Sequence, residues 1–371
     1  MTSLLPPSSG RFELAFEASH SGRWAGMWDA VPYITTMKDN PPPAALPFLV
    51  YEFGLGMLTP YVANPYELLD GRGVRWLRVR GTYDAIDRGL AFLGLTATVE
   101  PAWHGRIWWN SSQLRFSALP SNDVPLLGRI EGITRLSLPF RSDFRRGTHE
   151  YDVGPALGDH ARLDSCMLEH ESGIRLHGGG TIWSFGRLRE ADHVLTEEEG
   201  TAIGNWIEPP EGGLIPWTAM NYPWAEANFS WSETPETQRR ALMAAWFGDQ
   251  VLYLTLRDTE GEIIGHRRCR ARWPVKPQFD GPYQFGGTRY QPAPGGTRVY
   301  IEAMTDFDDA DGVVASGMAI TVGATRAEGI PPGRAWLDPG DLIGGEEIAV
   351  TATNTPLRKT VRDRVKLLLR F

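Results

Sequence analysis

The sequence is poor in cysteine and contains no obvious targeting segment. Only two cysteines occur among 371 residues, Cys166 and Cys269, and no Cys-x-x-Cys pair is present. This usage favours free thiols in a reducing compartment over a disulfide framework. Residues 1–16 lack a basic start followed by an unbroken apolar stretch, which is the pattern of a secretory signal. We therefore expect a cytoplasmic protein.

Other shortages exclude whole classes of function. No run approaches eighteen apolar residues, so no membrane-spanning helix is expected. The formal net charge of −8 disfavours nucleic acid as a partner, because phosphates require a basic face. Only Lys38 and Lys276 lie outside residues 355–371, which leaves little material for Schiff-base chemistry. The GxSxG, phosphate-loop, HExxH and GxGxxG motifs are also missing, and we expect no cofactor.

Glycine, proline and tryptophan are plentiful instead, with 41, 28 and 14 copies. Short segments between Gly and Pro residues favour an all-β fold over long helices. Residues 12–17 (FELAFE), for example, alternate apolar and polar residues as a half-buried strand does. We expect a first β domain, a sandwich or barrel, over residues 10–205. Its expected strands are 12–17, 48–55, 74–82, 92–100, 105–109, 113–118, 128–138, 162–170, 173–178 and 181–188.

A second β domain is expected over residues 214–345, after the acidic, Pro/Gly-rich connection 196–213. Its clearest element is a hairpin of residues 249–258 and 263–273, with Gly261 in the turn. Further strands are expected near 283–290, 297–304 and 313–323. A meander that closes as an antiparallel, lipocalin-like barrel would leave no exposed edges.

The C-terminal segment 355–371 has apolar residues at helical spacing after Pro356 and carries a net charge of +5. This pattern predicts a basic amphipathic helix. The favoured interpretation is that the helix caps the barrel and pairs with the acidic remainder of the chain. The alternative is weak contact with an anionic membrane surface.

Polar residues are densest in residues 149–180, which hold His149, His160, His170 and His177 among several carboxylates. One interpretation is a cupin-like metal site on adjacent strands. The spacing fits poorly, because His160 and Asp164 would lie about 13 Å apart along a strand. Polar residues on solvated surfaces therefore remain the favoured interpretation. His177 precedes three glycines, which permit either a tight turn or close approach of a ligand.

Two other charged stretches allow both a structural and a functional interpretation. Residues 266–272 (HRRCRAR) would place His266, Arg268, Arg270 and Arg272 on one strand face, either exposed or turned inward to bind an anion. Residues 305–312 (TDFDDADG) fail the calcium-loop pattern, because the fifth position is Ala310 and no closing glutamate follows. A hairpin turn is expected there.

The run 215–231 (IPWTAMNYPWAEANFSW) contains five aromatic rings and one charge. Its prolines and irregular periodicity predict a loop at a domain boundary, where ligand pockets commonly form. The donors expected to carry catalysis are Asn221, Tyr222 and Asn228. The residues expected to bind an apolar substrate are Trp217, Trp224, Phe229, Trp231, Trp246, Tyr253, Tyr283, Tyr300, Trp183 and His177.

The second half of the chain resembles a lipocalin-like two-domain family. The resemblance rests on the Trp-rich entry PWTAMNYPWAEANFSW followed by MAAWFGDQVLYLTLRDTEGEIIGHRRCRARW. That family includes carotenoid hydratases, kievitone hydratase, tocopherol cyclase and fungal decalin-forming Diels–Alderases. The resemblance implies two β domains and an apolar pocket in which a polyene, terpenoid or polyketide-like substrate is cyclised, isomerised or hydrated without a cofactor.

The residues suit such chemistry, because a cyclisation mainly needs reacting carbons held close together and a donor that polarises a carbonyl. We therefore expect a cofactor-free enzyme that acts on an apolar small molecule. The alternatives are a metal-dependent cupin-like enzyme that uses residues 149–177, and a non-catalytic module that binds lipid or sugar.

Overall fold

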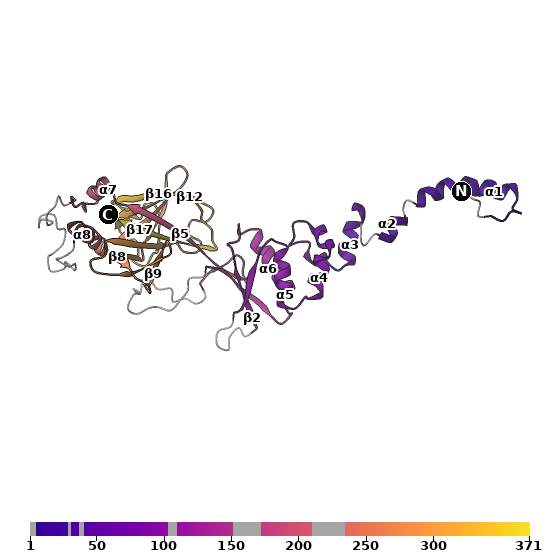
Figure 1. Cartoon of the computed structure of the whole chain (residues 1–371), viewed down its shortest axis with the longest axis horizontal. Coiled ribbons are helices and arrows are strands. Elements are labelled where there is room, and N and C mark those ends of the chain that lie inside the picture. The colour runs from indigo at the N-terminus through magenta and orange to yellow at the C-terminus, as the bar shows by residue number, and fades with distance from the viewer. Residues whose placement is uncertain (1–4, 29–30, 37–40, 103–109, 151–171, 210–233) are drawn as a thin grey trace. The chain divides into compact units, whose positions relative to one another are not determined.

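The computed structural model describes residues 5–28, 31–36, 41–102, 110–150, 172–209 and 234–371. The chain divides into two compact units (Figure 1). The first unit comprises residues 1–96 and 125–143, and the second comprises residues 97–124 and 144–371. Each unit contains a hydrophobic core of its own.

The first unit is helical. Its helices are α1 (Arg11–Trp28), α2 (Val31–Thr36), α3 (Leu46–Glu52), α4 (Arg72–Arg78), α5 (Tyr83–Ala91) and α6 (Leu126–Ser137), with 3₁₀ turns η1 (Pro43–Ala45), η2 (Gly56–Leu58) and η3 (Pro65–Asp70). Trp76 is fully buried in this unit, and its indole N–H donates to Ser137 Oγ at 2.9 Å. None of the helices in the described part of the chain is long and apolar enough to cross a membrane.

The prediction of strands in this region is therefore wrong at 12–17, 48–55, 74–82 and 128–138, which lie in helices α1, α3, α4 and α6. Helix α6 shows the reason. Its buried residues include Leu127, Ile130, Ile133 and Ser137, a spacing of three to four that places them on one helical face. Gly and Pro residues in this region predicted hairpin turns between strands. In the structure they lie between short helices. The chain is thus β-rich but not all-β.

The second unit contains two larger β-sheets. The first sheet has the strand order β1-β2-β3-β5-β17-β11-β8-β10-β9, with β4 paired to β5, and the second has the order β14-β7-β6-β12-β16. The strands of the first sheet are β1 (Ala97–Pro101), β2 (Ser111–Phe116), β3 (Asp143–His149), β4 (Ile174–Arg175), β5 (Ile182–Val194), β8 (Ala271–Pro277), β9 (Tyr283–Phe285), β10 (Thr288–Pro292), β11 (Arg298–Met304) and β17 (Val361–Arg370). Those of the second are β6 (Leu252–Arg257), β7 (Ile263–Arg268), β12 (Val314–Val322), β14 (Trp336–Leu337) and β16 (Glu346–Pro356). Neither strand path closes into a barrel among the described residues.

Smaller elements complete the second unit. Strands β13 (Thr325–Arg326) and β15 (Leu342–Ile343) pair with each other. Helix α7 (Glu197–Ala202) begins with a capping box of Thr196 and Glu199. Helix α8 (Pro235–Asp249), which the strand-based prediction did not include, has Thr234 as its N-cap.

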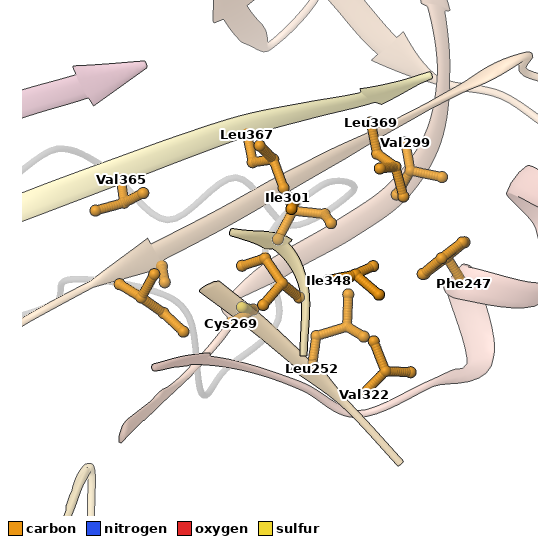
Figure 2. Packing of buried hydrophobic residues seen from close by; sticks show 14 of the residues in the cluster. Phe247, Leu252, Cys269, Val299, Ile301, Val322, Ile348, Val365, Leu367 and Leu369 are labelled. Carbon is orange, nitrogen blue, oxygen red and sulfur yellow. The ribbon is translucent and has the colours of Figure 1, made fainter. Parts of the chain in front are cut away.

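Alternate residues from both larger sheets form one core (Figure 2). Strand β11 contributes Val299 and Ile301, and β17 contributes Leu367 and Leu369. The second sheet supplies Leu252, Leu254, Ile320, Val322 and Ile348, and α8 adds Phe247. The two sheets therefore pack face to face as a sandwich. Its core contains residues at odd-numbered positions of β11 (Val299, Ile301 and Ala303) and of β17 (Val365, Leu367 and Leu369).

The expected hairpin is confirmed over 252–268, but its second arm ends at Arg268, because residues 271–273 lie in β8 of the first sheet. Strands β6 and β7 pair antiparallel, with Tyr253 opposite Arg268, and Gly261 has φ +85° in the connecting turn. Strands are also present in the expected stretches near 113–118, 181–188, 283–290, 297–304 and 313–323. The stretches 105–109 and 162–170 lie outside the described residues.

The expected meander is wrong. Strand β11 pairs with β8 and β17, whereas β12 pairs with β6 and β16. Residues 305–312 therefore cross from one sheet to the other and do not form a hairpin turn.

The predicted C-terminal helix is also wrong, because Val361–Arg370 is the interior strand β17. It pairs antiparallel with β11 and parallel with β5. Val365, Leu367 and Leu369 face the core at strand spacing, and this burial on the sheet decides between the two periodicities. Because no amphipathic helix forms here, the structural basis for the membrane-contact alternative is lost.

Candidate functional site

Most of the residues that we predicted to act on a substrate lie outside the described part of the chain. They are Trp217, Asn221, Tyr222, Trp224, Asn228, Phe229 and Trp231, which include all three expected catalytic donors. The assignment of these residues to a site stays a prediction.

The other predicted residues occupy several separate environments. Trp183 is fully buried among the rings of Phe116, Phe144 and Phe185. Trp246 is half-buried on α8 and packs against the sandwich core.

Tyr253 lies in a different small cluster with Ala324 and Leu337. His177 is exposed in the turn between β4 and β5. Among the predicted residues that the structure describes, Tyr283 and Tyr300 are brought together, because their rings stack with centroids 4.7 Å apart.

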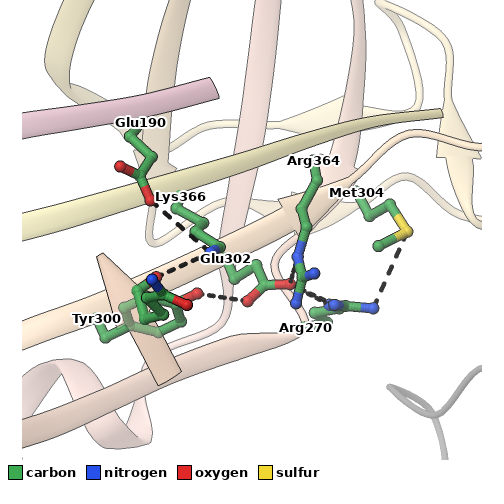
Figure 3. A network of polar contacts seen from close by, with 8 residues as sticks. Glu190, Arg270, Tyr300, Glu302, Met304, Arg364 and Lys366 are labelled. Atoms are coloured by element: carbon green, nitrogen blue, oxygen red, sulfur yellow. Dashed lines mark hydrogen bonds and ion pairs between the residues drawn. The ribbon is translucent and has the colours of Figure 1, made fainter. Parts of the chain in front are cut away.

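This tyrosine pair adjoins a group of charged side chains on the face of the first sheet that is opposite the sandwich core. Tyr300 and Glu302 alternate with core residues along β11, and Arg364 and Lys366 do so along β17. Lys366 lies directly opposite Glu302 in the register, and Arg270 immediately precedes β8 on the other side. We call Arg270, Tyr300, Glu302, Arg364 and Lys366 the Glu302 cluster (Figure 3).

Glu302 is the centre of this cluster, with only 1% of its surface exposed. Its Oε1 accepts hydrogen bonds from Nε of Arg270 and Nε of Arg364, each at 2.7 Å. A second guanidinium nitrogen of Arg270 donates to the same oxygen. Its Oε2 accepts the hydroxyl of Tyr300 at 2.6 Å (Figure 3). Both carboxylate oxygens therefore have partners.

The electrostatics follow from these contacts. Burial alone would raise the pKa of Glu302, but the two arginines and the hydrogen bonds outweigh it and hold the pKa below its usual range. Burial and the neighbouring carboxylate raise the pKa of Tyr300. Glu302 is thus an ionised acceptor and Tyr300 a neutral donor at ordinary pH, so neither is poised to exchange a proton.

Lys366 joins the cluster to the β9–β10 hairpin. Its Nζ donates to the Gln284 carbonyl at 2.8 Å and lies 3.8 Å from Glu190 of β5. Glu190 in turn accepts the Gly286 N–H of the hairpin at 3.1 Å. Burial is the main cause that lowers the pKa of Lys366. These contacts hold the hairpin against β5 and β17, and Figure 3 shows the one between Lys366 and Glu190.

Aromatic residues line the same region. Phe285, Tyr290 and Tyr300 are buried with Leu368, and Trp273 and Tyr283 pack against them while remaining half-buried. The site thus combines partly accessible rings with fixed cationic donors. Chemically, this arrangement places aromatic surface next to cationic groups that are already paired with Glu302 and with the Gln284 carbonyl.

The predicted basic face of residues 266–272 does not form one continuous surface. Arg270 pairs with Glu302, whereas His266 is buried and hydrogen-bonded to Thr255. Arg267, expected on the opposite face, lies near Asp306 and Asp309 of the crossing segment. Arg270 lies on the face of the first sheet opposite the sandwich core and pairs with a carboxylate of the chain itself, so the inward-facing alternative is not confirmed.

Sequence reasoning missed Glu302, Arg364 and Lys366. The helical interpretation of the tail does not account for the alternation of basic and apolar residues in VRDRVKLLLR. Period-two alternation over 361–370 was the available signal.

No group of three or more His, Cys, Asp or Glu side chains that could hold a metal ion occurs among the described residues. Most of the predicted 149–177 cluster, residues 151–171, lies outside them. The metal-site alternative therefore stays a hypothesis from the sequence.

Comparison with known proteins gives no family for this chain: no family model matches it, and no match to a curated protein was found.

Proposed function

We propose that the second unit binds an apolar, unsaturated small molecule beside the Glu302 cluster and cyclises or isomerises it without a cofactor. The observation that carries this proposal is the partly accessible Tyr283 ring, stacked on Tyr300 and adjacent to fixed arginine and lysine donors. The resemblance of the second half of the chain to lipocalin-like cyclases and hydratases agrees with it.

The chemistry of the cluster favours some reactions over others. Glu302 is saturated with donors, so it is a weak base, and Tyr300 already donates its proton. A Diels–Alder or related pericyclic step needs no proton transfer and gains from preorganised dipoles and close approach of the reacting carbons. Hydration of a double bond requires proton transfer and is therefore the less favoured member of the family's reactions.

The predicted aromatic residues of 215–231 are also part of this proposal. The support comes from the residues that precede and follow this stretch in the chain. Arg239 of α8 donates from Nε to the Ile207 carbonyl at 2.5 Å, and its guanidinium lies 4.7 Å from the Trp206 ring. The residues before and after 210–233 are thus held together beside α8. This helix also carries Trp246, another predicted substrate-binding residue.

Turnover of a linear conjugated triene with a terminal carbonyl tests the proposal. Wild-type protein is expected to accelerate cyclisation or isomerisation at least tenfold over buffer, measured by chromatography and mass spectrometry. Tyr283→Leu should remove most of this acceleration, because it deletes the accessible ring. Glu236→Gln, which changes an exposed ion pair on α8, should leave it unchanged. No acceleration, together with no apolar compound extracted from purified protein, would refute the proposal.

A non-catalytic binding module is the second candidate. It is favoured because both carboxylate oxygens of Glu302 already accept hydrogen bonds from neighbouring side chains. A carboxylate fixed by three side chains stabilises the fold whether or not a reaction follows. Retention of an apolar compound by wild type, its loss in Tyr283→Leu and the absence of any turnover would select this candidate.

A further inference from the structure

A buried arginine on α8 lacks the anionic partner that such a charge normally has. Only 6% of the surface of Arg239 is exposed. Its Nε donates to the Ile207 carbonyl at 2.5 Å, and no carboxylate in the described part of the chain forms an ion pair with it. Buried guanidinium groups are normally paired, because a charge removed from water is costly without a counter-charge. Arg239 is therefore a fixed cation that can still accept an anion.

Two carboxylates influence Arg239 without pairing with it. Glu236, in the first turn of α8, pairs with Arg240 instead, and Glu208 is exposed. Both favour the charged form of Arg239, yet burial outweighs them and lowers its pKa, and Arg240 adds to this effect. An arginine stays protonated at ordinary pH, so Arg239 cannot relieve the cost of burial by losing its proton.

The neighbouring Trp206 contributes a second unused donor. The Arg239 guanidinium lies 4.7 Å from the centre of the indole ring. Trp206 as a whole is half-buried, but its indole nitrogen is buried and has no hydrogen-bond acceptor among the residues that the structure describes. A buried indole N–H normally finds an acceptor. A cation without a counter-charge and an N–H without an acceptor thus lie side by side.

The surroundings hold both side chains in place. The Trp206 ring packs against Gly200 of α7, where an added Cβ would lie 2.7 Å from a ring carbon. Nδ2 of Asn205 donates to the Met243 carbonyl of α8 at 3.0 Å, which attaches residues 205–207 to this helix at a second point besides the Nε bond. The donors are therefore positioned before a ligand arrives, and less conformational entropy is lost on binding.

We propose that Arg239 and Trp206 form a binding site for an oxyanion, the carboxylate or phosphate group of a small ligand. The Ile207 carbonyl occupies Nε, which leaves Nη1 and Nη2 as the edge of the guanidinium that can bind two oxygens at once. The indole N–H is the further donor. None of these groups belongs to the Glu302 cluster, so the site is independent of the function proposed above.

Calorimetric titration of the full chain tests the site, with sodium acetate, sodium decanoate and inorganic phosphate as probes and chloride to keep the ionic strength constant. Wild-type protein should bind at least one probe saturably at a single site. Arg239→Gln should weaken this binding at least about tenfold, because it removes a charged hydrogen-bond donor.

Arg240→Gln is the matched control. It removes the same charge from the next position on α8, where the side chain is exposed, and should change the affinity by less than about threefold. No saturable binding of any probe, or an equal loss of affinity in both variants, would overturn the proposal.

The three probes also distinguish the sources of the oxyanion. Tighter binding of decanoate than of acetate identifies a carboxylate on an apolar chain, whereas tightest binding of phosphate identifies a phosphate ester. Either order supports the site, because both groups present paired oxygens to the same edge of the guanidinium.

A second measurement does not depend on the folding of a variant that lacks the Nε bond. The indole N–H signal of Trp206 in the NMR spectrum of wild-type protein, assigned by its loss in Trp206→Phe, should shift on titration with the tightest probe. The same concentration of chloride should leave the signal in place. An unchanged Trp206 signal at saturation would overturn the assignment of the site to this pair.

Discussion

Replacing Glu302 with glutamine should sharply destabilise the second unit. The amide group keeps the shape but removes the charge and places an N–H₂ group where donors already converge. Breaking a buried ion pair costs about 3–5 kcal/mol. The side chains of Arg270 and Arg364 remain 21% and 35% exposed, so they regain hydration. That exposure places the expected loss near the lower limit, about 3 kcal/mol.

Native-state hydrogen exchange of β11 and β17 measures this loss without assuming that both units unfold together. A loss of 3 kcal/mol corresponds to about a hundredfold faster exchange of the most protected amides. Glu236→Gln is the matched control, because its exposed partner Arg240 should make it cost less than about 0.5 kcal/mol.

The pH dependence gives a second check on the same variant. The pKa of Glu302 is lowered by its partners, so its contribution is present above the unfolded value of about 4.3 and is lost as the pH falls through the folded value. The difference between wild type and Glu302→Gln should therefore shrink below about pH 4. Exchange rates within threefold of wild type at pH 7 would refute the assignment of Glu302 as the centre of the network.

Three further outcomes follow from burial and close contacts. Cys269 is buried, and burial raises the pKa of its thiol to about 12. Alkylation at pH 8, followed by peptide mapping, should therefore label Cys269 only after the protein is denatured. Rapid labelling of the native protein would contradict this burial. Gly265→Ala would place its Cβ 2.4 Å from the Trp336 ring and should lower the free energy of unfolding, measured by hydrogen exchange, by about 1–3 kcal/mol. Gly333→Ala, where no atom lies near the new Cβ, should lower it by less than about 0.5 kcal/mol. In Gly128→Ala the new Cβ on α6 meets no neighbouring atom, so the substitution should stabilise the helix by about 0.5–1 kcal/mol. The thermal midpoint should therefore rise. A lower midpoint would contradict the open space at that position.

The sequence predicted strands well where alternation and turn chemistry agreed. The β6–β7 hairpin has buried Leu252, Leu254 and Leu256 at every second position and Gly261 with positive φ in its turn. Alternation reports which face a residue occupies, but it does not report which strand lies beside it. For this reason β11 and β12 were expected as neighbours, although they belong to different sheets.

The same limit explains why half of the candidate site was missed. Tyr283 and Tyr300 could be named from the sequence because aromatic side chains on strands commonly line binding sites. Glu302 could not, because a lone carboxylate on a strand is normally expected at the surface. Its burial depends on Arg364 being beside it on β17, sixty-two positions away in the chain.

The tail shows how the helix and strand interpretations compete. Leu357, Val361, Val365 and Leu368 satisfy a helical spacing, while Val361, Val365, Leu367 and Leu369 satisfy a strand spacing with Asp363 on the same face. Local pattern alone leaves the two nearly equal, so the tertiary environment decides. Here β5 and β11 offer backbone partners on both sides, and acidic residues such as Glu302 and Asp192 pair with the basic side chains. A basic stripe that would be solvated on a helix is thereby neutralised on a strand, and the charges that suggested a surface contact instead hold the sheet together.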